Sequence, residues 1–396
     1  MSWFGFGFNG FGQICLKPKD ECDKRGNTKV LTPVPLQNVC SCDSSGNDDV
    51  DKTTLNPKDN SEKTRQEIKV VASWSRRASI HINGDRCVCV SGVDSASGEE
   101  CFGPIPESEG CEDAVISERC LILRFPDRVE CWSWKRTGKA LAWSGVQDRT
   151  TPTNTSPDVT FPLVPGGYVA TQIPFFRPLS PRLHAVSLIL GTEHAVLLTA
   201  SGTIYTWGSG SHGQLGHGSL TSEDEPRALE ALWGVPMKYV AAGGWHSACI
   251  SAGGDLYMWG WNESGQIGLP SKGVNEESQK VESPGRGMLT ISKKEDGDSS
   301  NVFISIQAFP ALVDVPEVSE ISKVSCGSRH TVVITSTGDL YTWGWGQYGQ
   351  LGHGSECSSD EPKIVEYFSS GGMTVEDVVC GLWNTFVCAV PRKCSP

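Results

Sequence analysis

The amino-acid sequence predicts an all-β fold, a closed β-propeller of six or seven four-stranded blades. The first observation is a repeated block in which Trp-Gly is followed, six residues after the tryptophan, by Gly-Gln-Leu-Gly or Gly-Gln-Ile-Gly; the tryptophans are Trp207, Trp259 and Trp343. The second observation is that Trp207 and Trp259 are 52 positions apart, close to the period of a propeller blade. The third is that the chain starts and ends in mid-repeat, so that an N-terminal strand would complete the C-terminal half-blade.

The first copies of the unit along the chain are degenerate. "FGFNGFGQI" at the N-terminus has Phe6-Gly7 where Trp-Gly is expected. "DRCVCVSG" has Ser91-Gly92 there, and "TGKALAWSG" has Trp143-Ser144 there, again 52 positions further on. A further, eroded copy within residues 97–190 would make seven blades, and without it the ring would have six.

The next three copies are clear, and each contains a hairpin. Residues 194–208, 246–260 and 330–344 each combine two short apolar or β-branched runs around a turn such as "STG". At the C-terminus, "CGLWNTFVCAV" (Cys380 to Val390) repeats the first half of this unit. These segments predict the paired strands of successive blades.

Two polar segments interrupt the repeats in what we predict to be a single domain over residues 1–396. They cover residues 17–67 and 271–301. The second is charged and almost free of aromatic residues, so it can bury little apolar surface. We expect both to be insertions without regular structure.

The glycine-rich stretch "GSGSHGQLGHG" (Gly208 to Gly218) contains G-x-G-x-x-G, the spacing of a dinucleotide-binding turn. In such a site the glycines follow a strand and begin a helix. Here they follow a hairpin strand that ends in tryptophan, and the residues after them are rich in glycine. The spacing therefore predicts tight turns between strands, and we expect no nucleotide cofactor.

Composition excludes several classes of protein. The net charge is −12 and the basic residues are scattered, which argues against direct binding of nucleic acid. No apolar run approaches the length of a membrane span, and no basic start precedes an apolar stretch. We expect a soluble protein that has no signal peptide and binds no membrane.

The sixteen cysteines are expected to be reduced thiols, several of them inside apolar strands. "CSC" (Cys40, Cys42) and "CVC" (Cys87, Cys89) raise the alternative of a zinc site. Their spacing is C-x-C, where zinc sites usually have C-x2-C, and no pair of histidines follows. The sequence therefore predicts no metal site.

No catalytic motif is present: the chain has no G-x-S-x-G, no H-E-x-x-H and no P-loop, so we predict no catalytic residues and no enzyme. His194, His246 and His330 occupy one repeat position, where the last copy has Asn384. Since catalysis rarely requires one group per blade, we interpret these histidines as structural. The repeated tryptophans are expected to pack between blades, with the indole N–H on a local acceptor.

The residue before each repeat histidine differs from copy to copy. Such variation at a fixed position of the repeat is expected for residues on an exposed rim of the propeller. Tryptophan and arginine are the side chains most common at binding hot spots. Trp261 and Trp345, in the two "WGW" sequences, form a second set of candidates. The candidate partner-binding residues are therefore Glu193, Trp245, Arg329, Trp383, Trp261 and Trp345.

These motifs resemble the regulator-of-chromosome-condensation repeat. The resemblance lies in Trp-Gly-x5-Gly-Gln-Leu-Gly preceded by Cys-Gly-x2-His, and it covers residues 183–270 and 320–396 most clearly. It implies a β-propeller, usually of seven blades. Blocks such as "GGWHSACIS", "WGWNESGQ" and "FPALVDVP" look most similar to a member of that family that works with a JmjC-type oxygenase.

The resemblance implies a nuclear, chromosome-associated platform with some cytoplasmic pool. Its implied partner is a JmjC-type histone demethylase or hydroxylase, with a role in histone methylation and chromosome segregation. Histones, nucleosomes or a small GTPase are further implied partners. The alternative function is guanine-nucleotide exchange on a Ran-like GTPase, the activity of the family's founding member. The chain has no basic N-terminal tail and is acidic overall, which favours the platform.

Overall fold

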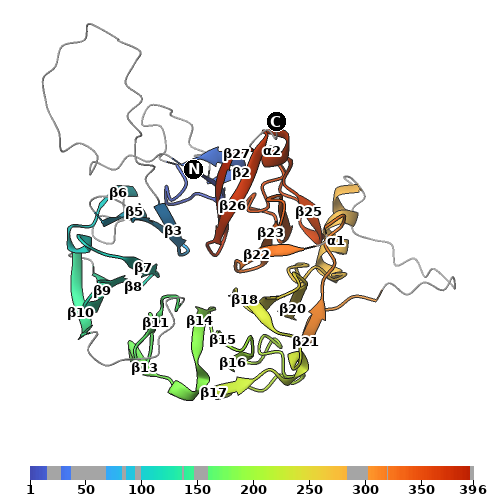
Figure 1. Ribbon diagram of the computed structural model, residues 1–396. Coiled ribbons are helices and arrows are strands. Elements are labelled where there is room, and N and C mark those ends of the chain that lie inside the picture. Colours follow the sequence, from blue (N-terminus) through green and yellow to red (C-terminus); the bar gives the residue numbers. More distant parts are fainter. Residues whose placement is uncertain are drawn as a thin grey trace, which may run out of the picture.

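The computed structural model describes residues 1–15, 28–36, 68–82, 86–93, 100–135, 138–146, 159–282, 302–318 and 320–392. Seven antiparallel sheets are arranged as a ring, and one edge strand of each sheet, such as β3, β7, β14, β18, β22 or β26, lies nearest its centre (Figure 1). The sheets have the strand orders β2-β1-β27-β26, β3-β4-β5-β6, β10-β9-β8-β7, β11-β12-β13, β14-β15-β16-β17, β18-β19-β20-β21 and β22-β23-β24-β25. The predicted propeller is thus confirmed, and of the two blade numbers left open by the sequence, six or seven, the structure has seven.

The strands account for nearly all of the regular structure. Their bounds in chain order are β1 Ser2–Phe8, β2 Lys29–Pro35, β3 Ile68–Ala72, β4 Arg76–His81, β5 Cys87–Val93, β6 Glu100–Pro104, β7 Asp113–Ile116, β8 Cys120–Arg124, β9 Arg128–Lys135, β10 Gly138–Val146, β11 Leu163–Val164, β12 Gly167–Val169, β13 Phe176–Pro178, β14 Ala185–Leu190, β15 His194–Thr199, β16 Ile204–Gly208, β17 Glu223–Ala228, β18 Met237–Ala242, β19 His246–Ser251, β20 Leu256–Trp261, β21 Ile306–Leu312, β22 Ile321–Cys326, β23 His330–Thr335, β24 Leu340–Gly344, β25 Ser359–Ile364, β26 Met373–Cys380 and β27 Asn384–Pro391. The helices are α1 Lys272–Glu282 and α2 Glu366–Ser370, with 3-10 turns at Pro106–Ser108, Pro181–Leu183 and Glu230–Leu232. Among the described residues, no helix is both long and apolar enough to cross a membrane.

The two ends of the chain form one blade. Strand β1 pairs antiparallel with β27, from Ser2 opposite Ala389 to Gly7 opposite Asn384. The predicted completion of the C-terminal half-blade by an N-terminal strand is therefore confirmed, and β2 adds an outer strand. Closure of the ring in this way leaves no first or last blade with an uncovered face.

The repeat glycine lies opposite the repeat histidine in each clear blade. Gly260, for example, pairs with His246, and its φ is +112°. A Cβ there would lie 2.5 Å from the carbonyl oxygen of Trp245, so a side chain would collide with the neighbouring strand. Gly7 and Gly92 occupy the same register and also have positive φ, which confirms the alignment of Phe6-Gly7 and Ser91-Gly92.

The alignment of Trp143-Ser144 with Trp-Gly is wrong. Trp143 lies on the outer strand β10, and Trp132-Ser133 on β9 occupy the Trp-Gly register opposite β8. Only two residues separate the end of β9 from the start of β10, so this copy is shorter than the others and the 52-residue spacing does not hold there. The eroded seventh copy sought within residues 97–190 is the three-stranded sheet β11-β12-β13.

Part of each predicted insertion has regular structure. Residues 17–67 include β2, which pairs with β1, and residues 271–301 include α1. The expectation of no regular structure is wrong for these parts, because the outer strand of a blade needs little apolar sequence and a helix can form in a polar one. The rest of both insertions lies outside the described residues.

The core consists of clusters between neighbouring blades. Trp259 is fully buried against Val196 and Leu198 of the preceding blade, and Trp343 packs in the same way against Ala248 and Met258. Burial of an indole contributes about 4–6 kcal/mol at about 25 cal/mol per Å². This confirms the prediction that the repeated tryptophans pack between blades.

Candidate functional site

The repeat histidines bind each blade to the next one. The imidazole Nε2 of His194 lies 2.7 Å from Ser247 Oγ, and that of His330 lies 3.0 Å from Thr385 Oγ1. The Ser247 hydroxyl in turn donates to the carbonyl of Gln214 (2.9 Å). Since a hydroxyl has one proton to donate, His194 must donate its Nε2–H to Ser247. The same arrangement recurs at His246.

These imidazoles are too buried to serve as acid–base groups near neutral pH. Burial lowers the pKa of His194 to about 4 and that of His246 and His330 to about 3. Their Nδ1 atoms are buried and have no hydrogen-bond partner in the described structure. The arrangement supports the structural interpretation of the repeat histidines.

The glutamine of each Gly-Gln-Leu-Gly turn supplies the acceptor for this contact. The carbonyl of Gln214 accepts from both Ser247 Oγ and the indole Nε1 of Trp259, the latter at 2.8 Å. The next glycine, Gly216, has φ +79°, and a Cβ there would lie 2.9 Å from Trp259 Nε1. Glycine is therefore required where the indole of the next blade approaches the turn.

The residue before each repeat histidine lies at one end of the propeller, beside the residue that follows the repeat glycine. The N–H of Trp261 donates to the carbonyl of Trp245 (2.9 Å), and that of Trp345 donates to Arg329 (2.8 Å). Two other blades have the same bond, both at 2.9 Å, from Phe8 to Trp383 and from Ser209 to Glu193. All six candidate residues therefore lie at this end.

One group of candidates surrounds Trp261. The rings of Trp245 and Trp261 meet edge to face, with centroids 5.5 Å apart. The Arg329 guanidinium lies 4.5 Å from the Trp261 ring, and His212 lies 5.6 Å from it. Burial lowers the pKa of Arg329, and the carboxylate of Glu263 opposes that effect. Arg329 is thus a half-buried cation whose guanidinium lies against the indole of Trp261.

A second group lies around Trp345 in the neighbouring blades. The Trp345 ring contacts Trp383 and Tyr348, with centroids 4.9 Å apart in both pairs. The Tyr348 ring also contacts that of Phe8, with centroids 5.0 Å apart, and the Lys29 Nζ atom lies 5.9 Å from the centroid of the Tyr348 ring. The chain of rings goes on through Phe11 to Trp74, which is 43% exposed. The two groups together are called the aromatic face below: His212, Trp245, Trp261, Arg329, Trp345, Tyr348, Trp383, Phe8, Phe11 and Trp74.

Four residues of the aromatic face were not among the candidates predicted from the sequence, although their repeat positions could have identified them: Phe8, Phe11, His212 and Tyr348. Phe11, His212 and Tyr348 each precede the Gly-Gln of their turn, so they share one repeat position. Phe8 directly follows a repeat glycine, as Trp261 and Trp345 do. Glu193 was predicted as a candidate, but its exposed side chain belongs to neither group of rings.

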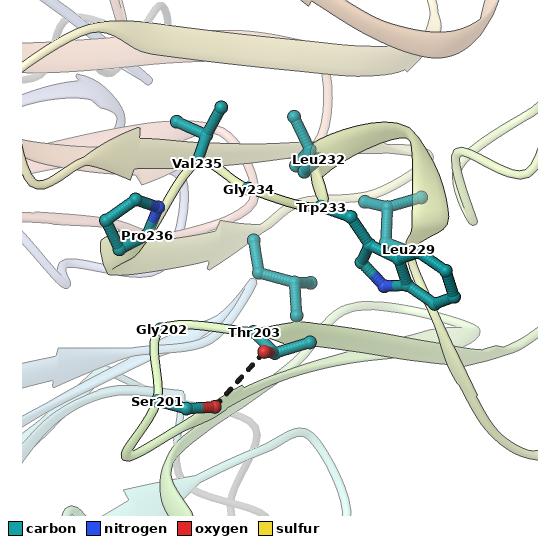
Figure 2. A pocket seen from close by; sticks show the side chains of 10 residues that line it. Ser201, Gly202, Thr203, Leu229, Leu232, Trp233, Gly234, Val235 and Pro236 are labelled. Carbon is teal, nitrogen blue, oxygen red and sulfur yellow. Dashed lines mark hydrogen bonds between the residues drawn. The ribbon is translucent and has the colours of Figure 1, made fainter.

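The opposite end of the blades has a hollow of about 340 Å³ between residues 201–204 and 229–236 (Figure 2). Its walls are mostly apolar, and its hydroxyls, Ser201 and Thr203, bond to each other at 3.1 Å. None of its lining residues is an acid, a base or a thiol. Trp233, which is 62% exposed, lies at its edge. This hollow offers no chemistry for catalysis, and Trp233 is a matched tryptophan at the other end of the propeller.

Comparison with known proteins identifies the repeat. The model of the regulator of chromosome condensation (RCC1) repeat matches residues 201–250, 253–334 and 337–388, and a second model of this repeat matches residues 185–214, 237–266 and 321–350. RCC1 domain-containing protein 1 from Homo sapiens is 40% identical over 414 residues, which cover 99% of this chain and 97% of that protein. The Mus musculus protein of the same name is 41% identical over 100% and 98%. Among solved structures, Prp20p from Saccharomyces cerevisiae superposes with a TM-score of 0.67 at 15% identity, over 99% of this chain and 92% of that chain.

Proposed function

Since the chain belongs to the RCC1 repeat family, we propose that it is a non-catalytic platform that binds a protein partner through its aromatic face. The observation that carries the proposal is the collection of half-buried rings and one stacked arginine at one end of the propeller. Tryptophan, tyrosine and arginine contribute most of the binding energy in protein interfaces. The repeat histidines, tryptophans and Gly-Gln turns join neighbouring blades. The residues of the aromatic face, in contrast, differ from blade to blade.

The proposed partner is a JmjC-type histone demethylase or hydroxylase. This part of the proposal rests on the resemblance of the repeat blocks and on the relationship to RCC1 domain-containing protein 1 over nearly the whole chain. The platform would act in the nucleus and on chromosomes, with some cytoplasmic pool, in histone methylation and chromosome segregation. A net charge of −12 is consistent with a protein partner, including basic histones, in preference to DNA.

The alternative is guanine-nucleotide exchange on a Ran-like GTPase. It is supported by the fold shared with Prp20p, whose crystal structure was described together with its binding properties to Gsp1p and histones. At 15% identity that likeness extends to the fold alone. The two functions differ in a measurable way, because an exchange factor accelerates nucleotide release and binds the nucleotide-free GTPase most tightly.

The test is affinity purification of the tagged full-length protein from nuclear extract, read by mass spectrometry. The double variant Trp245→Ala and Arg329→Ala removes two of the three side chains placed above against the Trp261 ring and leaves His212. Trp233→Ala is the control, since it removes an exposed tryptophan at the other end of the propeller. We expect a JmjC oxygenase with wild type and with the control, and at least tenfold less of it with the double variant.

Two results would contradict the platform. Undiminished recovery of the oxygenase with a folded double variant would exclude this group of rings as the binding site. Recovery of a Ran-like GTPase, together with faster nucleotide release in a purified exchange assay, would establish the alternative. The melting temperatures of all three proteins show whether a loss of capture reflects unfolding, and we expect them to be similar because the mutated side chains are only partly buried.

A further inference from the structure

Three metal-ligating side chains converge on one face of the blade β3-β4-β5-β6. His81 at the end of β4 pairs directly with Cys87 at the start of β5. Cys87 and Cys89 are two residues apart on one strand, so their side chains lie on the same face as that of His81. A ligand atom from each of the three residues lies within 4.8 Å of those of the others. Two thiols and one imidazole thus meet without any rearrangement of the backbone.

This donor set replaces the packing found in the other blades. At the register of Cys89, counted from the repeat glycine, three other blades have Tyr205, Tyr257 and Tyr341. At the register of His81, the same blades have Thr199, Ser251 and Thr335. A residue that differs from the repeat at a structural position does not make the packing contact that the other copies make there. In this blade the residues that differ at the two positions, His81 and Cys89, both have side chains that can bind a metal ion.

The surroundings suit a site with thiolate ligands. His81 and Cys89 are buried, and Cys87 is half-buried, so one side of the cluster reaches solvent. On the same face of β4, Arg77 is buried and its Nη2 donates to Ser91 Oγ at 2.8 Å. The Arg77 guanidinium also lies 5.9 Å from the ring of Phe386, so this face is turned to the blade formed by the two chain ends.

We propose that His81, Cys87 and Cys89 bind a zinc ion, which joins β4 to β5 beside the closing blade. Zinc takes thiolate ligands at about 2.3 Å and imidazole at about 2.0–2.1 Å, so tetrahedral donors are about 3.5–3.8 Å apart. Donor atoms within 4.8 Å reach that spacing by small side-chain rotations. Two Zn–S bonds and one Zn–N bond form, and any protons on the two thiols pass to solvent. Water or another donor completes the tetrahedral set of four ligands.

The expectation of no metal site rested on the C-x-C spacing and on the absence of a pair of histidines after the cysteines. The histidine lies before them, and only the register of β4 against β5 brings it opposite Cys87. The other C-x-C pair, Cys40 and Cys42, lies outside the described residues.

The first test is the zinc content of the full-length protein, expressed with added zinc and dialysed against zinc-free buffer. We expect about one equivalent per chain in the wild type and far less in the double variant Cys87→Ser and Cys89→Ser. Cys249→Ser is the matched control, because Cys249 is a buried thiol on β19, the strand that corresponds to β4, and no histidine lies opposite it: its partner is Tyr257. It should keep the wild-type content. Wild-type protein with almost no zinc, or a double variant with undiminished zinc, would overturn the proposal.

A cobalt titration keeps the proposal testable even if the double variant does not fold. Co²⁺ bound by two thiolates and an imidazole in wild-type protein should give sulfur-to-cobalt charge-transfer bands and the visible bands of a tetrahedral site. His81→Gln should weaken cobalt binding at least tenfold while the charge-transfer bands remain at saturation. An octahedral spectrum without sulfur bands in the wild type, or an unchanged affinity in His81→Gln, would show that these residues are not the ligands.

Discussion

The imidazole Nε2 of His246 lies 3.0 Å from the hydroxyl Oγ1 of Thr331 in the following blade. Thr331 donates to the carbonyl of Gln266 at 2.7 Å, so the histidine is the donor in the first bond. The repeat motif therefore encodes contacts between blades: its histidine and its glutamine turn act on residues of the next copy. A change at one of these positions should loosen two blades together.

We expect His246→Ala to lower the free energy of unfolding by about 2–4 kcal/mol, because it leaves a cavity and removes a buried hydrogen bond. Equilibrium denaturation in urea, followed by fluorescence, measures this change. His212→Ala removes a half-exposed imidazole of the aromatic face and should cost less than about 1 kcal/mol. Equal effects of the two substitutions would show that the contact between blades adds little stability.

Stability should fall in mild acid. An unfolded histidine has a pKa of about 6.5, whereas the pKa is about 4 for folded His194 and about 3 for folded His246 and His330. Between these values the unfolded chain binds more protons, so the free energy of unfolding rises with pH in this window. The stabilisation is fully present above about pH 6.5 and is lost as the pH falls towards 4 and 3.

Urea midpoints at about pH 7 and pH 5 measure this dependence. His330→Asn should have a smaller difference between the two midpoints, because it removes one of the three buried imidazoles. Asparagine is the residue at this position in the closing blade, as Asn384, so the substitution suits the register. A variant with the full wild-type dependence would contradict the role of buried imidazoles in it.

Gly216→Ala should destabilise the protein by about 2–4 kcal/mol, because the left-handed backbone and the indole of Trp259 both oppose a Cβ there. Gly234→Ala is the control: its φ is also positive, at +88°, but no atom lies within 4 Å of the added Cβ. It should cost only about 1–2 kcal/mol, for the backbone conformation. Thermal denaturation of the two variants separates the two causes, and equal losses would show that contact with Trp259 is unimportant.

The rings of Trp345 and Trp383 should be energetically coupled. Their centroids are 4.9 Å apart at an interplanar angle of 69°, an edge-to-face contact worth about 0.5–1.5 kcal/mol. A double-mutant cycle with alanine at both positions, read by urea denaturation, measures the coupling. Trp383 and Trp245 lie two blades apart, so their cycle should be additive within about 0.5 kcal/mol. A coupling near zero for Trp345 and Trp383 would mean that the aromatic face is not preorganised.

Much of the candidate face could be predicted from the repeat. Trp245, Arg329 and Trp383 can be identified because they occupy the position directly before the repeat histidine, which differs between copies while the residues around it are repeated. A variable position in a repeated motif indicates a turn at the rim. Contacts between them could not be predicted, because they join residues of different loops and blades. Arg329 stacks on Trp261 of the preceding blade, and Phe11 reaches Trp74 of the following one.

The periodic motifs specified the ring and its closure, because each copy encodes the same hairpin and the same contact with its neighbour. Local pattern failed where a copy was compressed or eroded: Trp143 was aligned to the wrong strand, and β11-β12-β13 has no Trp-Gly motif at all. Only the register of β4 against β5 brings His81 opposite Cys87. Only the packing of neighbouring blades brings the rings of the aromatic face together, as it does for Trp345 and Trp383. The physical reason is the range of the interactions: turns and hairpins form within a few residues, whereas these sites depend on strand pairing and on loops that meet only when the ring has closed.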